Sequence, residues 1–129
     1  MPSRAPCAIV LVAVALAVLS AAAPAGAAPA TRTCRSADLR YPFESGGPRT
    51  FGVFNLRITG GTCATAHRVA RAWMRAFEKR LRGPGRLRLP RSVGGFRFTT
   101  LPPKAAQTYR ERGRRRSTTI RFDYVVPNG

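Results

Sequence analysis

Apolar residues follow two different periods in this chain. In the stretch Gly60–Arg82 they recur every three or four residues, which predicts an amphipathic helix. Thr62 is a suitable N-cap, and Gly83-Pro84-Gly85 ends the helix. The other face is mostly basic. The apolar face holds Ala66, Val69, Ala70, Trp73, Phe77 and Leu81, with Met74 at its flank.

The segments on either side of this helix alternate with a period of two, which predicts strands. Thr50–Thr59 is expected to turn Phe54, Leu56 and Ile58 toward the core. Gly95–Leu101 reads as a second strand. Ser117–Val126 reads as the last strand, with Ile120, Phe122 and Tyr124 on one side. Thr33–Tyr41 is a weaker strand candidate.

Glycine and proline mark the connections. Pro42–Arg49 is expected to be a loop, and Pro102–Arg116 a longer loop with a helical turn near Lys104–Tyr109. The resulting order, strand–strand–helix–strand–strand, predicts an α+β domain in which one helix packs on a small antiparallel sheet. We expect a flexible leader and loop at 28–49, the domain at 50–126 and a tail at 127–129.

The N-terminus has the pattern of a secretory signal peptide. Arg4 precedes the uncharged run Ala8–Ala23, and small residues follow it. Cleavage after Ala27 fits the small-x-small rule and predicts a secreted, extracellular protein. The alternative is an uncleaved membrane anchor, for which the apolar run is short. Cys7 precedes the run, whereas a lipoprotein cysteine would follow it.

Two cysteines, Cys34 and Cys63, remain in the mature chain. Outside the cytosol, two cysteines in a small domain usually form one disulfide. Closing the loop between them is worth roughly 3–4 kcal/mol by loop-closure entropy. That would be a large share of the net stability of a domain of this size.

Charge is the most unusual bulk property. The chain has 23 Lys and Arg against 5 Asp and Glu, and a formal net charge of +18. Removal of residues 1–27 takes away only Arg4, so the net charge falls from +18 to +17. The excess of arginine over lysine is also what codon bias in a GC-rich genome produces. Either way, the surface will attract polyanions in a salt-dependent manner.

Two arginine clusters are the candidate binding residues, because planar guanidinium groups suit phosphate and carboxylate oxygens. The first cluster lies in the predicted loop before the last strand, and the second on the polar helix face. We expect them to form a polyanion footprint. The residues are Arg110, Arg112, Arg114, Arg115 and Arg116, with Arg68, Arg71 and Arg75.

The stretch Gly61-Thr62-Cys63-Ala64-Thr65-Ala66, followed by Val69-Ala70-Arg71-Ala72-Trp73, resembles a module of small secreted actinobacterial proteins without an assigned activity. Gly95-Phe96-Arg97-Phe98 and Thr119-Ile120-Arg121-Phe122 match its later strands. The resemblance implies the fold, export and a Cys34–Cys63 pairing, but no chemistry. Phe98 stands where such relatives often have cysteine, and the late strand also lacks one.

The sequence offers few groups for catalysis or metal binding. Cys63 and His67 are four residues apart and would share a helix face, as a thiolate–imidazole pair requires. The same residues with Cys34 give too few ligands for a compact metal site. The carboxylates are spread apart and surrounded by arginine, so charge compensation is expected rather than a glycosidase pair. They are Asp38, Glu44, Glu78, Glu111 and Asp123.

The glycine pairs do not stand in a P-loop or dinucleotide-binding context, so no cofactor is expected. The sequence therefore favours a secreted, monomeric, basic domain that associates with anionic envelope polymers rather than with a specific nucleic acid. Two alternatives remain. One is a small extracellular enzyme or enzyme inhibitor built on the loops Pro42–Arg49 and Pro102–Arg116. The other is a cationic antimicrobial protein.

Overall fold

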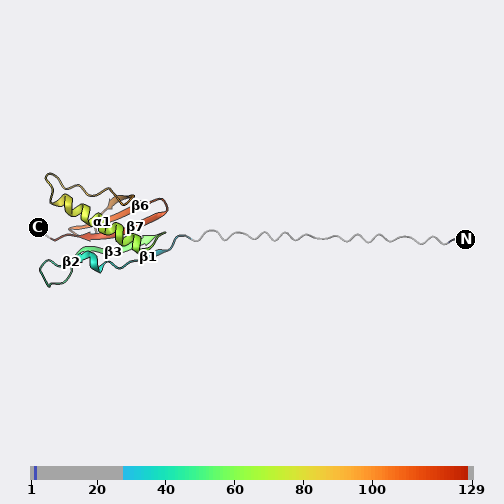
Figure 1. The fold of residues 1–129 in the computed structure, drawn as a ribbon, viewed down its shortest axis with the longest axis horizontal. Helices are drawn as coiled ribbons and strands as arrows, with labels where there is room; N and C mark the ends of the chain where they lie inside the picture. The colour runs from blue at the N-terminus through green and yellow to red at the C-terminus, as the bar shows by residue number, and fades with distance from the viewer. Residues whose placement is uncertain (1, 3–27, 128–129) are drawn as a thin grey trace.

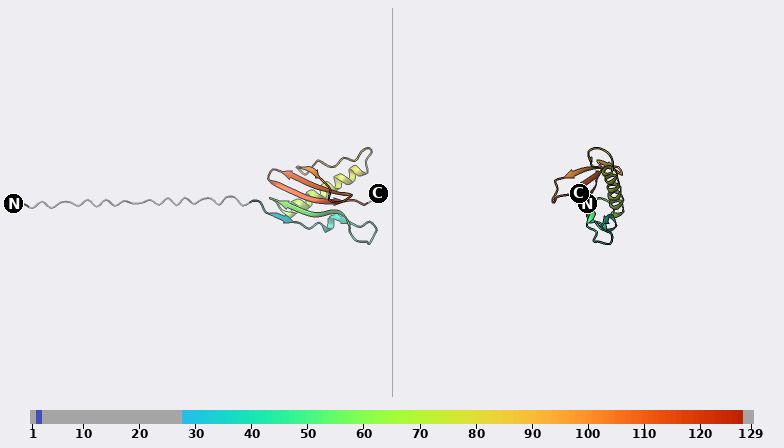
Figure 2. Two further views of the ribbon diagram at one scale, coloured as in Figure 1. Left: turned by 180° about the vertical axis from the view of Figure 1, so that it is seen from behind. Right: turned by 90° about the vertical axis from the view of Figure 1, so that its left-hand side faces the viewer.

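The computed structural model describes residue 2 and residues 28–127, so the predicted signal peptide and the final two residues lie outside the described part. Within 28–127, seven antiparallel strands form one sheet, and a long helix covers one of its faces (Figures 1 and 2). The sheet order is β1-β3-β7-β6-β5-β4, and β2 also pairs with β3. The strands are β1 (Thr31–Thr33), β2 (Arg40–Tyr41), β3 (Phe51–Thr59), β4 (Ser92–Val93), β5 (Phe96–Leu101), β6 (Thr108–Arg115) and β7 (Thr118–Val125).

Helix α1 (Cys63–Leu81) forms where the apolar period predicts it. The Thr62 hydroxyl accepts a hydrogen bond from the Thr65 backbone N–H, which confirms the N-cap. The face toward the sheet buries Ala66, Val69, Ala70, Trp73 and Phe77. Leu81 was expected to continue this face, but it is 57 % exposed because the last turn of α1 is not covered by the sheet.

Trp73 lies at the centre of the core. Its ring stacks on Phe77 with centroids 5.4 Å apart and meets Phe122 and Tyr124 edge-on at 5.2 and 5.3 Å. Phe96 and Phe98 of β5 are both buried in the same core. Offset and edge-on aromatic pairs add to the large area that these side chains bury. The α+β fold, with one helix on an antiparallel sheet, is therefore confirmed.

A bulge in β3 changes which side chains reach the core. The register with β7 shifts between Phe54 and Arg57, and Asn55 has a φ of 51°. The extra residue reverses the alternation, so that Val53 is buried before the bulge and Leu56 after it. The prediction that Phe54 faces the core is therefore wrong. Its ring is half-buried beneath the Arg40 guanidinium, 4.2 Å from the ring centroid.

The loop predicted at Pro102–Arg116 is mostly a strand, and this is the main correction. β6 occupies Thr108–Arg115 and pairs along its length with both β5 and β7. Its inward-facing positions are Tyr109, Glu111 and Gly113, so they give no apolar alternation in the sequence. Gly113 is required because a Cβ there would lie 2.6 Å from the Phe98 ring.

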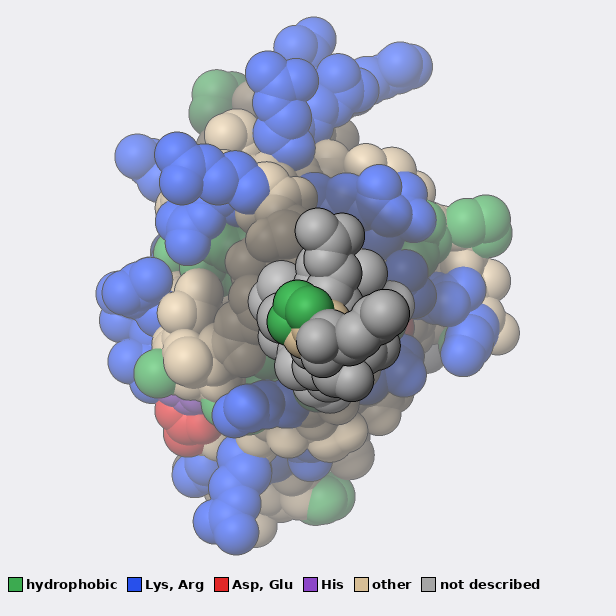
Figure 3. Space-filling model, turned by 90° about the vertical axis from the view of Figure 1, so that its right-hand side faces the viewer, with side chains coloured by type: hydrophobic (Ala, Val, Ile, Leu, Met, Phe, Trp, Pro, Cys, Tyr) green, Lys and Arg blue, Asp and Glu red, His purple; other side chains and the backbone are tan. Residues whose placement is uncertain are grey.

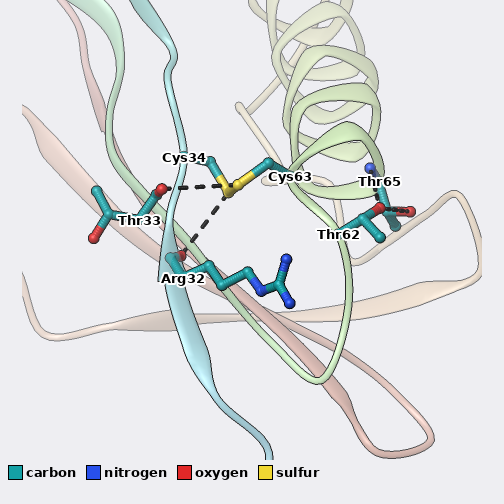
Figure 4. Close-up of a disulfide and its surroundings, with 6 residues drawn as sticks. All are labelled: Arg32, Thr33, Cys34, Thr62, Cys63 and Thr65. Atoms are coloured by element: carbon teal, nitrogen blue, oxygen red, sulfur yellow. Dashed lines mark hydrogen bonds between the residues drawn. A yellow bond between two sulfur atoms is a disulfide. The ribbon is translucent and has the colours of Figure 1, made fainter.

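The predicted strand order also changes at the N-terminal side. The segment expected to be a flexible leader and loop contains β1, a short 3₁₀ helix η1 (Ala37–Leu39) and β2. A disulfide joins Cys34, just after β1, to Cys63 in the first turn of α1 (Figure 4). The Cys34 N–H also donates to the Leu56 carbonyl. The predicted disulfide is confirmed, and the folded unit begins at Thr31 rather than near Thr50.

Of the helices in the described residues, none combines the length and hydropathy that a bilayer-spanning segment needs.

Candidate anion-binding face

Three arginines form a row across the sheet on the face opposite α1. Arg57 of β3 stands directly opposite Arg121 of β7, and Arg121 stands directly opposite Arg112 of β6. Side chains at directly opposed positions have Cβ atoms about 5 Å apart. The alternation of each strand turns these three side chains away from α1, since their neighbours Leu56, Ile58, Ile120 and Phe122 are buried under it. We call Arg57, Arg112 and Arg121 the arginine row.

The same face carries further arginines beside the row. Arg97 of β5 stands opposite Arg114 of β6, one pleat from Arg112. Threonines lie beside these arginines on the same face. The hydroxyl groups of Thr31 and Thr59 form a hydrogen bond of 2.8 Å. We call this surface the open face. Its arginines are Arg57, Arg97, Arg110, Arg112, Arg114 and Arg121.

One carboxylate, Asp123, stands among these arginines. Its Oδ1 lies 4.0 Å from Nε of Arg110, and its Oδ2 accepts a 2.8 Å hydrogen bond from Asn55. Arg110 also donates to the Pro102 carbonyl. Within residues 28–127, the arginine row makes no ion pair, and Nε of Arg112 is buried without a hydrogen-bond partner. The positive charge of the arginine row is therefore not paired with any carboxylate of the described residues.

A shallow hollow of about 230 Å³ lies beside the row. It is lined by Arg57 and Arg121 together with threonines from β1, β3 and β7. Guanidinium groups and hydroxyls together offer the donors that a phosphate, sulfate or carboxylate group accepts. Figure 3, which shows one end of the molecule, has Lys and Arg side chains over most of its rim.

The structure divides the predicted polyanion residues among four places. Arg110, Arg112 and Arg114 lie on the open face. Arg68, Arg71 and Arg75 lie on α1, on the other side of the sheet. Arg115 faces the side of α1, where its guanidinium sits 4.5 Å from the Phe96 ring and donates to the Gly94 carbonyl. Arg116 occupies the β6–β7 turn with a φ of 52°. One continuous footprint of all eight residues is therefore not formed.

The helix arginines are partly neutralised. The carboxylate of Asp38 in η1 forms a 2.7 Å hydrogen bond with Nε2 of His67. It also accepts a 2.9 Å hydrogen bond from Arg71. The His67 hydrogen bond, helped by Arg71, holds the pKa of Asp38 below its usual value. This cluster ties η1 to α1 beside the disulfide. It also pairs Arg71, one of the three helix arginines, with a carboxylate.

The catalytic alternatives based on Cys63 are not supported by the geometry. Cys63 is oxidised to the disulfide with Cys34, so it offers no thiolate, and His67 is engaged with Asp38. In the described part of the chain, no group of three His, Cys, Asp or Glu side chains is placed to hold a metal ion.

The two loops proposed for an enzyme or inhibitor surface do meet. Phe43 and Phe51 lie beside Ala106 and Gln107 in a hollow of about 400 Å³ that Val125 and Val126 complete. Its lining contains no titratable or nucleophilic side chain. This hollow therefore lacks the groups that acid–base or nucleophilic catalysis requires.

Glu111 is the one fully buried carboxyl group in the described residues. Its Oε1 accepts a 2.7 Å hydrogen bond from the Thr100 hydroxyl, while Oε2 has no partner. Burial raises the pKa of Glu111 to about 7. Its neighbours across the sheet are Thr100 and Phe122, so no arginine neutralises it from these positions.

Sequence reasoning missed Arg57, Arg97 and Arg121 as site residues. Each lies in a segment that was correctly predicted as a strand, on the side away from the apolar residues. The alternation of apolar and polar residues therefore already places each arginine on the outer side of its strand. The strand pairing that brings these arginines side by side is not visible in the sequence.

No protein-family model, curated protein or solved structure matches this chain. The resemblance to secreted actinobacterial proteins stays a prediction.

Proposed function

We propose that this chain is a secreted domain that binds an anionic polymer of the cell envelope on the open face of its sheet. The observation that carries the proposal is the arginine row, Arg57–Arg121–Arg112, in which like charges stand directly opposite each other without a carboxylate. Such an arrangement costs stability in the free protein. A row of phosphate, sulfate or carboxylate groups would relieve that cost.

The geometry favours an extended polymer over a single small anion. Adjacent strands are about 4.8 Å apart, so the row presents guanidinium groups at regular intervals across three strands. Arg97 and Arg114 continue the charge toward the β5 edge. The surface is broad and shallow, with one acidic side chain, so it suits repeated charge contacts along a chain.

Chemical-shift mapping tests this location. The ¹⁵N-labelled domain is titrated with a heparin oligosaccharide, a soluble polyanion used as the probe. Arginine Nε–Hε signals and backbone amides are followed. We expect the largest changes at Arg57, Arg112 and Arg121, and small changes along α1. Changes centred on Arg68 and Arg75, or no changes at low salt, would refute the proposal.

A further inference from the structure

A second basic surface lies along the β5 edge of the sheet, next to the open face. It is a groove of about 950 Å³ between the last turns of α1, the segment after it and β5. We call it the edge groove. It is lined by Arg80, Leu87, Arg88, Leu89, Pro90, Arg91, Phe98, Thr99 and Thr100.

The wall of the edge groove opposite β5 is held in place. Nη1 of Arg80 donates hydrogen bonds to the carbonyl oxygens of Arg88 and Leu89, at 2.9 and 2.8 Å. Pro90 is buried in the domain, and the Arg91 carbonyl accepts a 2.8 Å hydrogen bond from the Phe98 N–H. The groove is therefore formed before any partner arrives, which lowers the ordering cost of binding.

The other wall is a sheet edge with unused backbone groups. The Phe98 N–H points outward to Arg91, and a strand directs the backbone groups of alternate residues to the same side. The N–H and C=O of Thr100 therefore also point outward, into the groove. Among the described residues, β4 pairs with β5 only at Phe96 and Arg97, so Thr100 has no neighbouring strand on this side.

The charge of the groove selects the partner. Three of its nine lining residues are arginines and none is acidic. A second hollow, lined by Arg80, Arg86 and Arg88 with Gly83, Pro84 and Gly85, adjoins it and extends the basic surface. Leu87 is 37 % exposed beside these charges and offers an apolar contact. A free strand edge beside arginines suits an extended peptide with alternating acidic side chains.

We infer that the edge groove binds an extended acidic peptide, which pairs with β5 at Thr100 and places its carboxylates on Arg88 and Arg91. Backbone hydrogen bonds to Thr100 align the peptide, and the arginines select its charge. The Thr100 hydroxyl takes no part, because it is already donated to Glu111. The arginines of this groove are different from those of the arginine row, so peptide binding and polymer binding can be tested independently.

Fluorescence anisotropy tests the inference with a labelled heptapeptide of alternating Glu and Val, blocked at both ends. In Thr100→Pro the outward N–H is lost without breaking the ladder to β6. We expect binding to weaken about five- to tenfold, the effect of one backbone hydrogen bond. Thr100→Val keeps the N–H, so its affinity should stay within about twofold of the wild type on the same argument.

Two further measurements make the test independent of how well Thr100→Pro folds. The same peptide, N-methylated at every residue, keeps its charge but has both backbone edges blocked, so it cannot pair with a strand. We expect it not to compete. The Arg88→Ser/Arg91→Ser variant should lose binding, whereas Arg57→Ser/Arg121→Ser should keep it. Equal competition by the N-methylated peptide, or an equal loss in both double variants, would overturn the edge-groove site.

Discussion

Arg112 of β6 and Arg121 of β7 are directly opposed on the open face of the sheet, and neither has a carboxylate partner within residues 28–127. Opposed like charges are destabilising. We therefore expect Arg112→Thr to raise the free energy of unfolding by about 0.5 kcal/mol at low salt, and by less near 1 M salt, where the charges are screened.

Urea denaturation at both salt concentrations measures this effect. Arg32→Thr is the matched control, because it removes one strand arginine that stands opposite Ile58 rather than another arginine. An equal gain in both variants would show that net charge, and not the arginine row, is responsible.

The buried carboxyl of Glu111 makes stability depend on pH. Its pKa is about 7 in the folded chain against an ordinary value of 4.5. The folded state therefore favours the protonated form, and stability is lost as the pH rises from about 4.5 to 7. We expect Glu111→Gln to raise the free energy of unfolding at pH 8 by up to about 3 kcal/mol, since one pKa unit corresponds to 1.36 kcal/mol.

At pH 4 the Glu111→Gln gain should vanish, because the wild-type carboxyl is then neutral in both states. Glutamine can still accept the Thr100 hydrogen bond. Denaturation curves between pH 4 and 8 measure the difference. A gain that does not change with pH would mean that Glu111 does not titrate in this range.

Gly113 and Phe98 fit together across β5 and β6. A Cβ at Gly113 would lie 2.6 Å from the Phe98 ring, which is buried and cannot move freely. We expect Gly113→Ala to cost about 1–3 kcal/mol of stability, as overpacking does in cores. In a Phe98→Leu background the cost should be smaller. Additive losses in the double-mutant cycle would contradict this contact.

The disulfide fastens the N-terminal segment to α1. Cys34 and Cys63 are 29 residues apart in sequence. Replacing both by serine should lower the free energy of unfolding by roughly 3–4 kcal/mol, because the unfolded chain regains the conformational entropy that the closed loop removes. Thermal and chemical denaturation of the Cys34→Ser/Cys63→Ser variant measure it. A loss below about 1 kcal/mol would show that the β1–β3 pairing and the Asp38 cluster hold this segment without the crosslink.

The helix and the last strand could be predicted because each has a local pattern, and the disulfide because only two cysteines follow the predicted signal peptide. α1 has a 3.6-residue apolar period with a capping threonine, and β7 has a clean alternation ending at Tyr124. β6 could not be predicted, because its core-facing positions are Tyr109, Glu111 and Gly113. Phe54 was misplaced because the bulge at Asn55 shifts the alternation, and a positive φ at asparagine has no certain sequence signal.

The candidate site could be predicted only in part. Arginine abundance pointed to anion binding, and Arg110, Arg112 and Arg114 do share one face. The sequence places Arg57 far from Arg121, and only the β3–β7 pairing makes them neighbours. Likewise, the helical arginines were grouped with the others by charge, although the sheet separates the two groups.

Matched triple variants test the central claim that the open face binds the polymer. Arg57→Ser/Arg112→Ser/Arg121→Ser and Arg68→Ser/Arg71→Ser/Arg75→Ser remove the same charge from opposite faces. Heparin binding is measured for each from about 50 to 300 mM salt, where counterion release sets the slope. The open-face variant should lower the slope of log K against log salt by about 2–3, and the helix variant by less than about 1. Equal losses of slope in the two variants would contradict the account.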